Sequence, residues 1–391
     1  MPLVNMSDML DHAYRHGYAV GAFDLVSLDF LEAIMAGAEA CQAPVILSLA
    51  ESHFEYYDFE LAMAATVAAA RRARVPVAIH LDHGASVDSA VNAIRLGCTG
   101  VMVDASTLPF TKNLRITRQV ADMAHSCGVP VEGELGYVAG VEGEDAQKHP
   151  GAVVYTSPQE AREFVRQTKV DFLAVSIGTV HGRMQGEPKL DLERLEAIRQ
   201  AVDIPLVIHG GTGLSDEQFH ALIARGVAKI NYYTALSDAA AARIGENFRT
   251  ASGAGYTRLL AGVRTAIQDE VKRRIRLWGG ADRTAEVLEA CRPWQEVEHF
   301  IVYNLSGEAE SHADEFKAIG RDMLARVPGV RRVVSGRAWQ EDARYRHCWL
   351  IRFAGIDTIT SYMAHPDHVA YADQYFRPHA GDRLKIDYVL D

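Results

Sequence analysis

The chain has 391 residues, of which 48% are hydrophobic and 23% are charged. This composition is typical of a folded globular protein, and the length allows one large domain and a smaller one. The formal net charge is −11, from 51 acidic and 40 basic residues, so the chain lacks the basic field that attracts nucleic acids. No stretch of about 18 apolar residues predicts a membrane span, and the N-terminal segment lacks the apolar centre of a signal peptide.

The five cysteines are scattered and odd in number, and no CxxC pair occurs. Such a pattern indicates reduced thiols rather than a disulfide framework or a thiolate metal site. Together with the missing signal peptide, it leads us to expect a cytoplasmic protein.

Short apolar runs alternate with helical patterns over the first two thirds of the chain. The runs are rich in Val and Ile, as buried parallel strands are, and they cover residues 19–23, 45–49, 77–81, 100–103, 131–135, 172–177, 206–208 and 228–231. The helical patterns between them include residues 28–41, 86–96, 111–127, 190–201 and 215–225. Eight strands alternating with helices predict an α/β fold, a (β/α)₈ TIM barrel. A doubly wound open sheet is the alternative, but it does not explain polar residues at the end of every strand.

The pattern changes after residue 278. Strand-like runs at residues 299–305, 330–336, 348–353 and 384–389 surround a helical pattern at residues 313–325. This order predicts a small α+β unit, long enough to be a separate domain. We therefore expect a barrel domain over residues 1–285 and a second domain over residues 295–391.

Three histidines follow the ends of predicted barrel strands. His83 belongs to the segment HLDHG after the third strand, His181 follows the sixth strand, and His209 follows the seventh. The carboxyl ends of barrel strands surround the usual active-site face, so these imidazoles can converge on one point. Three histidine ligands with an open position are typical of a catalytic zinc site.

Carboxylates line the same predicted face. Asp82 precedes His83, Asp104 ends the fourth strand, and Glu132 and Glu134 alternate on the fifth strand, where Glu134 lies nearer the strand end and is the better candidate ligand. Glu142 lies in a loop flanked by glycines, which can close over a substrate and carry a base with it.

A phosphate site is predicted after the last two strands. Gly210, Gly211 and Thr212 follow the seventh strand, and residues 231–234 follow the eighth. Barrels frequently bind phosphate there through backbone N–H groups and hydroxyls.

These residues carry a resemblance to a known family. Residues 3–277 resemble the class II ketose-bisphosphate aldolases, especially the tagatose-type subgroup, in the stretches 18–23, 81–84, 131–136, 177–182, 186–191 and 226–231. The resemblance implies an aldehyde-lyase that cleaves a phosphorylated ketose, a small-molecule sugar phosphate, into a dihydroxyacetone-phosphate-like donor and an aldehyde.

The resemblance also implies the roles of the site residues. Zn²⁺ would be held by His83, His181 and His209, with Asp82 as the acid/base at the hydroxyl of the cleaved bond and Glu142 as the group that moves the proton on the donor carbon. Asp104 and Glu134 would hold the zinc in an alternative position, a second divalent metal or a monovalent cation. The donor phosphate would contact Gly182, Gly210, Gly211, Thr212, Asn231, Tyr232, Tyr233 and Thr234.

The sequence departs from the family on the side of the acceptor aldehyde. Asp24 stands where Asn is usual, Ala50 where a Ser usually touches the substrate, and Tyr233 where Asp or Asn is usual. In the family, an arginine contacts the second phosphate of the bisphosphate substrate. That arginine is missing here, and Arg258 lies in the corresponding region of the sequence. These changes affect the expected bisphosphate substrate more than the reaction.

The C-terminal unit resembles the stress-responsive A/B barrel domains, which are ferredoxin-like modules that usually dimerise. The carrying stretches are residues 299–302, 327–330, 364–368 and 384–388. This resemblance implies a homo-oligomer, a dimer or a tetramer. We expect His365 and His368 to cap and pack a helix rather than to bind a ligand.

Two other functions fit parts of the pattern. A sugar-phosphate sensor on the same scaffold would need the ligands but no proton-transfer groups, so Asp82 and Glu142 speak against it. A zinc hydrolase would use metal-bound water, but such barrels commonly begin with a His-x-His pair, and here the first strand ends with Phe23 and Asp24.

Overall fold

The computed structural model describes residues 2–145, 154–183, 189–251 and 253–390. The chain divides into two compact units: the first holds most of residues 1–293, and the second holds residues 294–391 with the short segments 91–97 and 122–129. Each unit has its own cluster of buried apolar side chains. The exact domain limits expected from the sequence, 1–285 and 295–391, stay predictions.

The first unit contains a closed barrel, which confirms the predicted fold and excludes the open sheet. Its eight parallel strands follow the order β1-β10-β9-β7-β5-β4-β3-β2. Every strand-like run of the sequence analysis forms one of them: β1 (Val20–Asp24), β2 (Val45–Ala50), β3 (Val77–Gly84), β4 (Gly100–Val103), β5 (Val131–Leu135), β7 (Phe172–Val175), β9 (Leu206–Ile208) and β10 (Val227–Tyr232).

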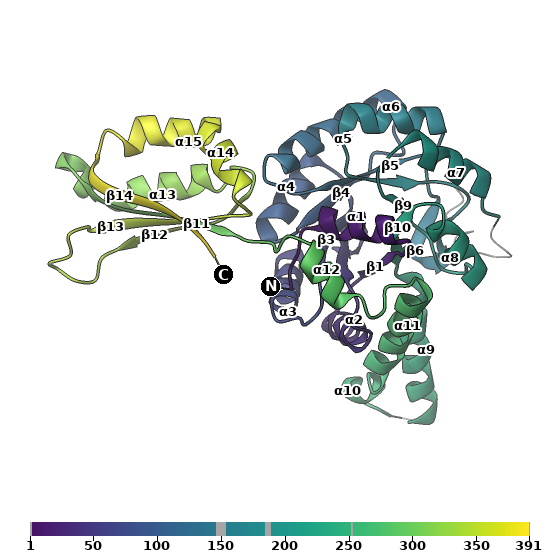
Figure 1. Ribbon diagram of the computed structural model, residues 1–391. Helices are drawn as coiled ribbons and strands as arrows, with labels where there is room; N and C mark the ends of the chain where they lie inside the picture. The colour runs from purple at the N-terminus through teal and green to yellow at the C-terminus, as the bar shows by residue number, and fades with distance from the viewer. Residues whose placement is uncertain (1, 146–153, 184–188, 252, 391) are drawn as a thin grey trace. The chain divides into compact units, whose positions relative to one another are not determined.

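Helices surround this barrel (Figure 1). The helices of the unit are α1 (Met6–His16), α2 (Leu28–Ala40), α3 (Phe59–Arg71), α4 (Val87–Leu96), α5 (Phe110–His125), α6 (Pro158–Thr168), α7 (Leu192–Ala201), α8 (Asp216–Ile223), α9 (Thr234–Thr250), α10 (Tyr256–Leu259), α11 (Val263–Leu277) and α12 (Thr284–Ala290), with the 3₁₀ turn η1 (Glu51–His53). Ser157 caps α6 and Ser215 caps α8, as Ser at a helix start predicts. No helix in the described part of the chain is long and apolar enough to cross a membrane.

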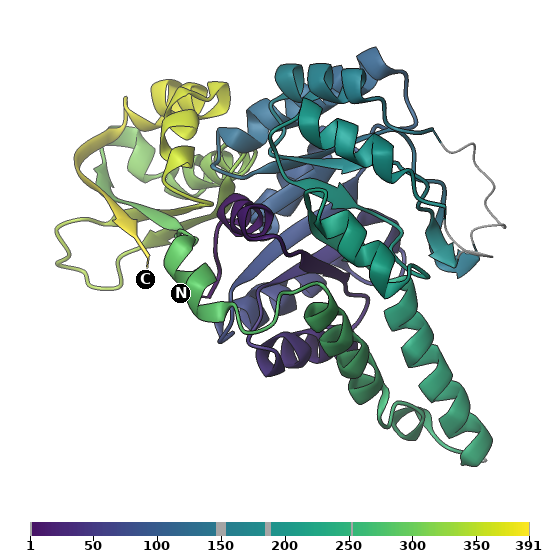
Figure 2. The same ribbon diagram turned by 45° about the vertical axis from the view of Figure 1, so that its right-hand side comes forward.

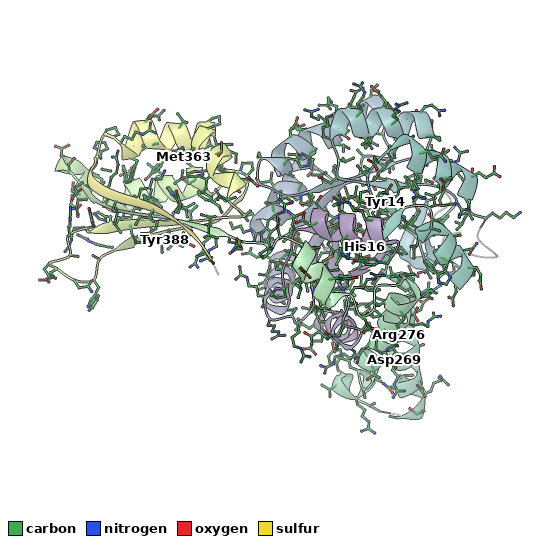
Figure 3. All side chains as sticks on the ribbon, in the orientation of Figure 1. Tyr14, His16, Asp269, Arg276, Met363 and Tyr388 are labelled. Carbon is green, nitrogen blue, oxygen red and sulfur yellow. The ribbon has the colours of Figure 1, made fainter. Side chains whose placement is uncertain are left out.

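Helix α1 closes the amino-terminal end of the barrel. Its apolar residues Met6, Met9 and Leu10 are fully buried and form one cluster with inward-pointing strand residues such as Ile46 and Ala78. Figures 1 and 2 show α1 lying across the strands, and Figure 3 labels Tyr14 and His16 on it. Because this end is filled by apolar side chains, the polar residues collect at the carboxyl ends of the strands.

One expectation was wrong. The segment 136–145, predicted as a loop, contains the strand β6 (Gly140–Asp145), which pairs with β8 (His181–Arg183) in a small parallel sheet. The pairing begins at Gly140, whose φ of 103° favours glycine and where an added Cβ would lie 2.2 Å from the His181 carbonyl oxygen. This long-range pairing gives the backbone partners that a solvated loop would lack.

The C-terminal unit has the predicted α+β fold. Four antiparallel strands in the order β12-β13-β11-β14 form its sheet, and α13, α14 and α15 cover one face of it (Figure 1). The elements are β11 (Val297–Leu305), η3 (Gly307–Glu310), α13 (Ala313–Leu324), β12 (Val330–Arg337), β13 (His347–Phe353), α14 (Asp357–Ala364), α15 (Pro366–Tyr371), η4 (Ala372–Phe376) and β14 (Ala380–Val389). His365 caps α15, and the buried His368 ring packs on Tyr362, as expected.

The glycine in α13 provides a test of this packing. An added Cβ at Gly320 would lie 2.6 Å from Tyr371 Cζ and 2.8 Å from Trp349 Cζ2, whereas one at Gly245 in α9 would meet nothing within 4 Å. We expect Gly320→Ala to lower the free energy of unfolding by about 1–3 kcal/mol through overpacking. Gly245→Ala should raise it by roughly 0.5–1 kcal/mol, the usual helix preference for alanine. Urea unfolding of both variants measures this contrast, and equal stabilisation by both would contradict it.

Candidate functional site

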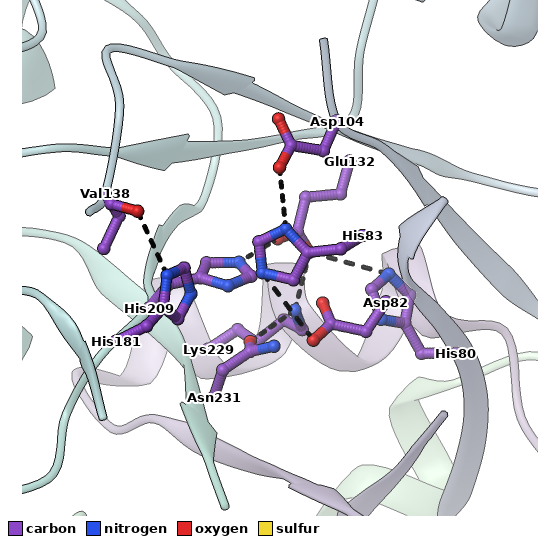
Figure 4. A network of polar contacts seen from close by, with 10 residues as sticks. All are labelled: His80, Asp82, His83, Asp104, Glu132, Val138, His181, His209, Lys229 and Asn231. Carbon is purple, nitrogen blue, oxygen red and sulfur yellow. Dashed lines mark hydrogen bonds and ion pairs between the residues drawn. The ribbon is translucent and has the colours of Figure 1, made fainter. Parts of the chain in front are cut away.

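The three predicted histidines converge at the carboxyl ends of the strands. One ring nitrogen from each of His83, His181 and His209 lies within 4.8 Å of the other two. The ring centroids are 4.6–5.7 Å apart, and Figure 4 shows the rings turned toward one another. The barrel thus brings together residues that are far apart in the sequence.

Each histidine is oriented by a hydrogen bond at its other nitrogen. His83 Nδ1 donates to Asp104 Oδ2 at 2.9 Å, His181 Nδ1 donates to the Val138 carbonyl at 3.1 Å, and His209 Nε2 donates to Glu132 Oε1 at 3.0 Å. Because the acceptors are a carbonyl and two carboxylates, these nitrogens carry the protons. The opposite nitrogens are therefore the ones with free lone pairs.

Those opposite nitrogens fit a metal ion. His83 Nε2, His181 Nε2 and His209 Nδ1 are buried and have no hydrogen-bond partner among the described residues. Buried polar atoms are nearly always paired, so three such nitrogens facing one another need a shared partner. Three neutral imidazoles, each supported at the other nitrogen, form the usual cradle for zinc.

A bulge in β3 lets two consecutive residues reach this site. The pairing with β4 shifts between Leu81 and Gly84, and His83 has a φ of 47°, which is rare for a residue with a side chain. In a regular strand, Asp82 and His83 would point to opposite faces. Here Asp82 Oδ2 lies 3.9 Å from His83 Nε2. An added Cβ at Gly84 would lie 2.5 Å from the Met102 carbonyl oxygen, so the bulge also requires a glycine there.

Asp82 has the properties of a buried base. Its carboxylate is fully buried, and neither oxygen has a hydrogen-bond partner among the described residues. Burial alone would raise the pKa of Asp82, but the electrostatic influence of His83, His209 and Lys229 outweighs burial and lowers the pKa to about 2. An ionised carboxylate beside the histidines can accept a proton from a bound substrate.

A second possible metal position shares His83. Ligand atoms of His83, Asp104 and Glu134 also lie within 4.8 Å of one another. Burial and then the Asp104 carboxylate raise the pKa of Glu134 to about 8, because two carboxylates in one buried site repel. A cation bound there would relieve that repulsion. The side chain of Glu142, on β6, lies outside the described part of the structure.

Two candidate phosphate residues, Gly182 and Gly210, directly follow His181 and His209 in the chain. Gly210 adopts a φ of 71°, and an added Cβ would lie 2.2 Å from the Val180 carbonyl oxygen, so only glycine fits after His209. Gly182 also has a positive φ, 84°. Thr234 begins the 17-residue helix α9, and N–H groups of a first helical turn attract anions.

Tyr232, the last residue of β10, and Tyr233, which follows it, point in different directions. The Tyr232 hydroxyl donates to Glu270 Oε1 at 2.8 Å, and its ring packs against Phe23 and Trp278. These contacts place the Tyr232 side chain on the helix side of the strand, away from the histidines. Tyr233 instead packs on the buried His53, with ring centroids 4.5 Å apart.

The sequence analysis missed one member of the site. Lys229 is fully buried, and its Nζ lies 2.8 Å from Glu132 Oε2. Glu132, judged the weaker candidate ligand, instead accepts a hydrogen bond from His209 (Figure 4). A lysine within the apolar run of β10 was the available signal, because a charged residue in a buried strand needs a partner.

The comparisons with known proteins agree with this geometry. Residues 4–283 match the family model "Fructose-bisphosphate aldolase class-II", and residues 297–390 match "Stress responsive A/B Barrel Domain". A fructose-bisphosphate aldolase of Geobacillus stearothermophilus is 44% identical over 237 residues, which are 60% of this chain and 82% of that protein. A probable fructose-bisphosphate aldolase of Bacillus subtilis is 39% identical over 287 residues, 72% of this chain and 100% of that protein. The crystal structure of the YdjI aldolase from Escherichia coli K12 has a TM-score of 0.65 and 34% identity, covering 72% of this chain and 99% of its own.

The histidine cluster leads to a prediction about metal binding. Each of His83→Ala, His181→Ala and His209→Ala should weaken zinc binding by more than the roughly 10–100-fold that loss of a group supporting a ligand costs. Titration of the metal-free protein with zinc against a chromophoric chelator measures this. His12 of α1 is the matched control, since it is buried and its Nδ1 lies 3.0 Å from the Tyr18 hydroxyl. An unchanged affinity in the three variants would contradict the assignment.

Proposed function

Since the chain belongs to the class-II fructose-bisphosphate aldolase family, we propose that it reversibly cleaves a phosphorylated ketose into a dihydroxyacetone-phosphate-like donor and an aldehyde, with zinc as its metal. The observation that supports this most is the set of three inward-facing imidazole nitrogens next to the buried Asp82 carboxylate. The proposed ligands of the ion are His83, His181 and His209, and Asp104 with Glu134 offers the alternative position.

The side chains of the site divide the proton transfers between them. A divalent ion held by the three histidines would supply charge to polarise the ketone oxygen and to stabilise the negative charge of the donor half. Asp82 accepts the proton of the hydroxyl next to the breaking carbon–carbon bond, which becomes the aldehyde carbonyl. Glu142, carried on β6, then returns a proton to the donor carbon. The phosphate of the donor is held at Gly182, residues 210–212, Asn231, Tyr233 and Thr234, with Tyr232 limited to its backbone.

The acceptor end of the site differs from the donor end. Asp24, at the end of β1, is fully buried and aligns with Ser48 of β2, and Ala50 aligns with Asp82. His53 Nδ1 and the Ser48 hydroxyl are buried without a hydrogen-bond partner among the described residues. These groups can bind hydroxyls, and the Asp24 carboxylate repels a phosphate. Arg183 is bound to Asp238 at 2.9 Å, and Arg258 is exposed. We infer that the acceptor aldehyde carries no terminal phosphate.

The C-terminal unit is proposed to join copies of the chain. On the sheet face that the helices leave open, Phe300 aligns with Leu350 and with Ile386, and Leu350 aligns with Val334. Leu384, on the same face, is 46% exposed. A continuous apolar row across four strands is costly to leave in water. A second copy of the same sheet is the complementary surface, so we propose a dimer or a higher oligomer built from it.

The mechanism predicts a metal-dependent reaction without an imine. Chelation should abolish ketose cleavage, and added zinc or cobalt should restore it. Asp82→Asn should keep zinc but lower kcat by roughly 10²–10⁴-fold, the usual contribution of one acid/base group, and Glu142→Gln should slow proton exchange on the donor carbon more than it weakens donor binding. Inactivation by borohydride in the presence of substrate, with indifference to chelators, would contradict the mechanism.

The acceptor end predicts a preference among substrates. Because one partner of a buried charge pair is typically worth about 2–5 kcal/mol, kcat/KM for fructose and tagatose 1,6-bisphosphate should fall about 30-fold or more below that of ketose 1-monophosphates of the same length. Asp24→Asn should narrow this gap by removing the repulsive charge. Steady-state kinetics on fructose and tagatose 1,6-bisphosphate and on the two corresponding 1-monophosphates measure this preference. A clear preference for either bisphosphate would show that the second phosphate is recognised.

The exposed apolar row predicts how the oligomer is disrupted. Leu350→Glu should dissociate it, because the row would then bury an unpaired charge. Met363→Glu is the control, since Met363 lies on α14, on the side of the sheet that the helices cover (Figure 3). Tyr388, also labelled there, marks the sheet strand β14. Light scattering after gel filtration measures the mass of each variant. An unchanged mass for Leu350→Glu would place the interface elsewhere.

A further inference from the structure

The carboxylate of Glu132 joins four strands inside the barrel. Its Oε1 accepts a hydrogen bond from His209 after β9, and its Oε2 lies 2.8 Å from Lys229 Nζ of β10 and 3.6 Å from His80 Nε2 of β3. The side chains of all these residues have no exposed surface. In the barrel order, β7 and β9 separate β5 from β10, so the Glu132–Lys229 pair reaches across the interior rather than along one strand (Figure 4).

This carboxylate selects the tautomer of His209. A carboxylate only accepts hydrogen bonds, so His209 Nε2 must carry the proton. The lone pair then lies on Nδ1, which is the buried nitrogen left without a partner among the described residues. Histidine ligands are commonly fixed in this way by the group on their other nitrogen.

The lysine fixes a second residue of the site. Lys229 Nζ donates to Asn231 Oδ1 at 2.6 Å. An ammonium group has donors only, so the amide oxygen of Asn231 must face Lys229 and its amide nitrogen must point the other way. Asn231 Nδ2 is buried and has no hydrogen-bond partner among the described residues. It is thereby presented as a donor to a substrate oxygen.

We propose that Glu132 and Lys229 form a positioning pair that couples the metal ligand His209 to the substrate-binding amide of Asn231. The inference rests on the metal site of the proposed function. One buried pair sets both the tautomer of the ligand and the orientation of the amide, so its loss impairs metal binding and substrate binding together. Neither residue touches the reacting atoms, and both act through their neighbours.

Stability alone does not explain the pair. Replacing a buried ion pair by apolar residues of similar volume is often neutral or stabilising, whereas removing one partner leaves an uncompensated charge. The double variant Glu132→Leu/Lys229→Met should therefore stay folded, although it lacks both orienting contacts. The matched control is Glu296→Leu/Arg331→Met, which removes a buried pair 2.5 Å apart in the C-terminal unit, which holds none of the residues of the Glu132 network.

The experiment compares zinc and donor binding in the full chain. We expect the double variant to keep the melting temperature of the wild type but to bind zinc about 10–100-fold more weakly in competition with a chromophoric chelator. The visible spectrum of the cobalt-loaded protein should change as the geometry at His209 loosens. At saturating zinc, calorimetry should show weaker binding of dihydroxyacetone phosphate. The control variant should match the wild type in all three measurements.

The outcomes separate this inference from the proposed function. Wild-type protein that takes up no zinc would contradict the proposed function and this coupling with it. Wild-type zinc binding together with equal zinc and donor affinities in the double variant would overturn only the positioning role. If the double variant does not fold, Glu132→Gln/Lys229→Met decides, since it leaves no uncompensated charge, keeps an acceptor for His209 and removes the donor to Asn231: weakened donor binding supports the coupling, and unchanged donor affinity overturns it.

Discussion

The arrangement of the site depends on the rule that charge inside a dry barrel must be paired. Glu132 and Lys229 are both fully buried, and each is compensated by the other. Glu132 also accepts a hydrogen bond from His209, and Lys229 also donates one to Asn231. A layer of ordinary apolar side chains would fill the same space without fixing either residue. The ion pair therefore fixes the orientation of His209 and Asn231, which an apolar layer would not do.

The two ends of the barrel show how this chemistry is kept to one face. Helix α1 fills the amino-terminal end with apolar side chains. At the other end, His83, His181 and His209 follow three different strands and are held by three different acceptors. Because each ring is fixed at one nitrogen, the cluster is preorganised, and a bound ion does not have to order it. The C-terminal unit has a separate apolar core.

Much of this could be predicted from the sequence, because it depends on local pattern. Continuous apolar runs of Val and Ile predicted all eight barrel strands, and the α+β order of the C-terminal unit predicted its sheet. The candidate ligands were found by the same route: a polar residue directly after an apolar strand lies at the carboxyl end of the barrel, wherever the strand itself lies. His83, Asp104 and His209 were identified in this way, and the structure places His83 in one group with His209 and in a second group with Asp104.

Other features were decided only by the tertiary structure. Alternation along β3 would separate Asp82 from His83, and only the register shift against β4, with the positive φ of His83, brings both into the site. The sequence ranked Glu134 above Glu132 as a candidate ligand, but it gave no role to Glu132, which only its pairing with Lys229, nearly a hundred positions away, reveals. The strand β6 likewise exists because β8 lies beside it. The sequence by itself determined which residues end the strands, since periodicity and burial are local; bulges, charge pairs and short added sheets depend on partners that the folded chain supplies.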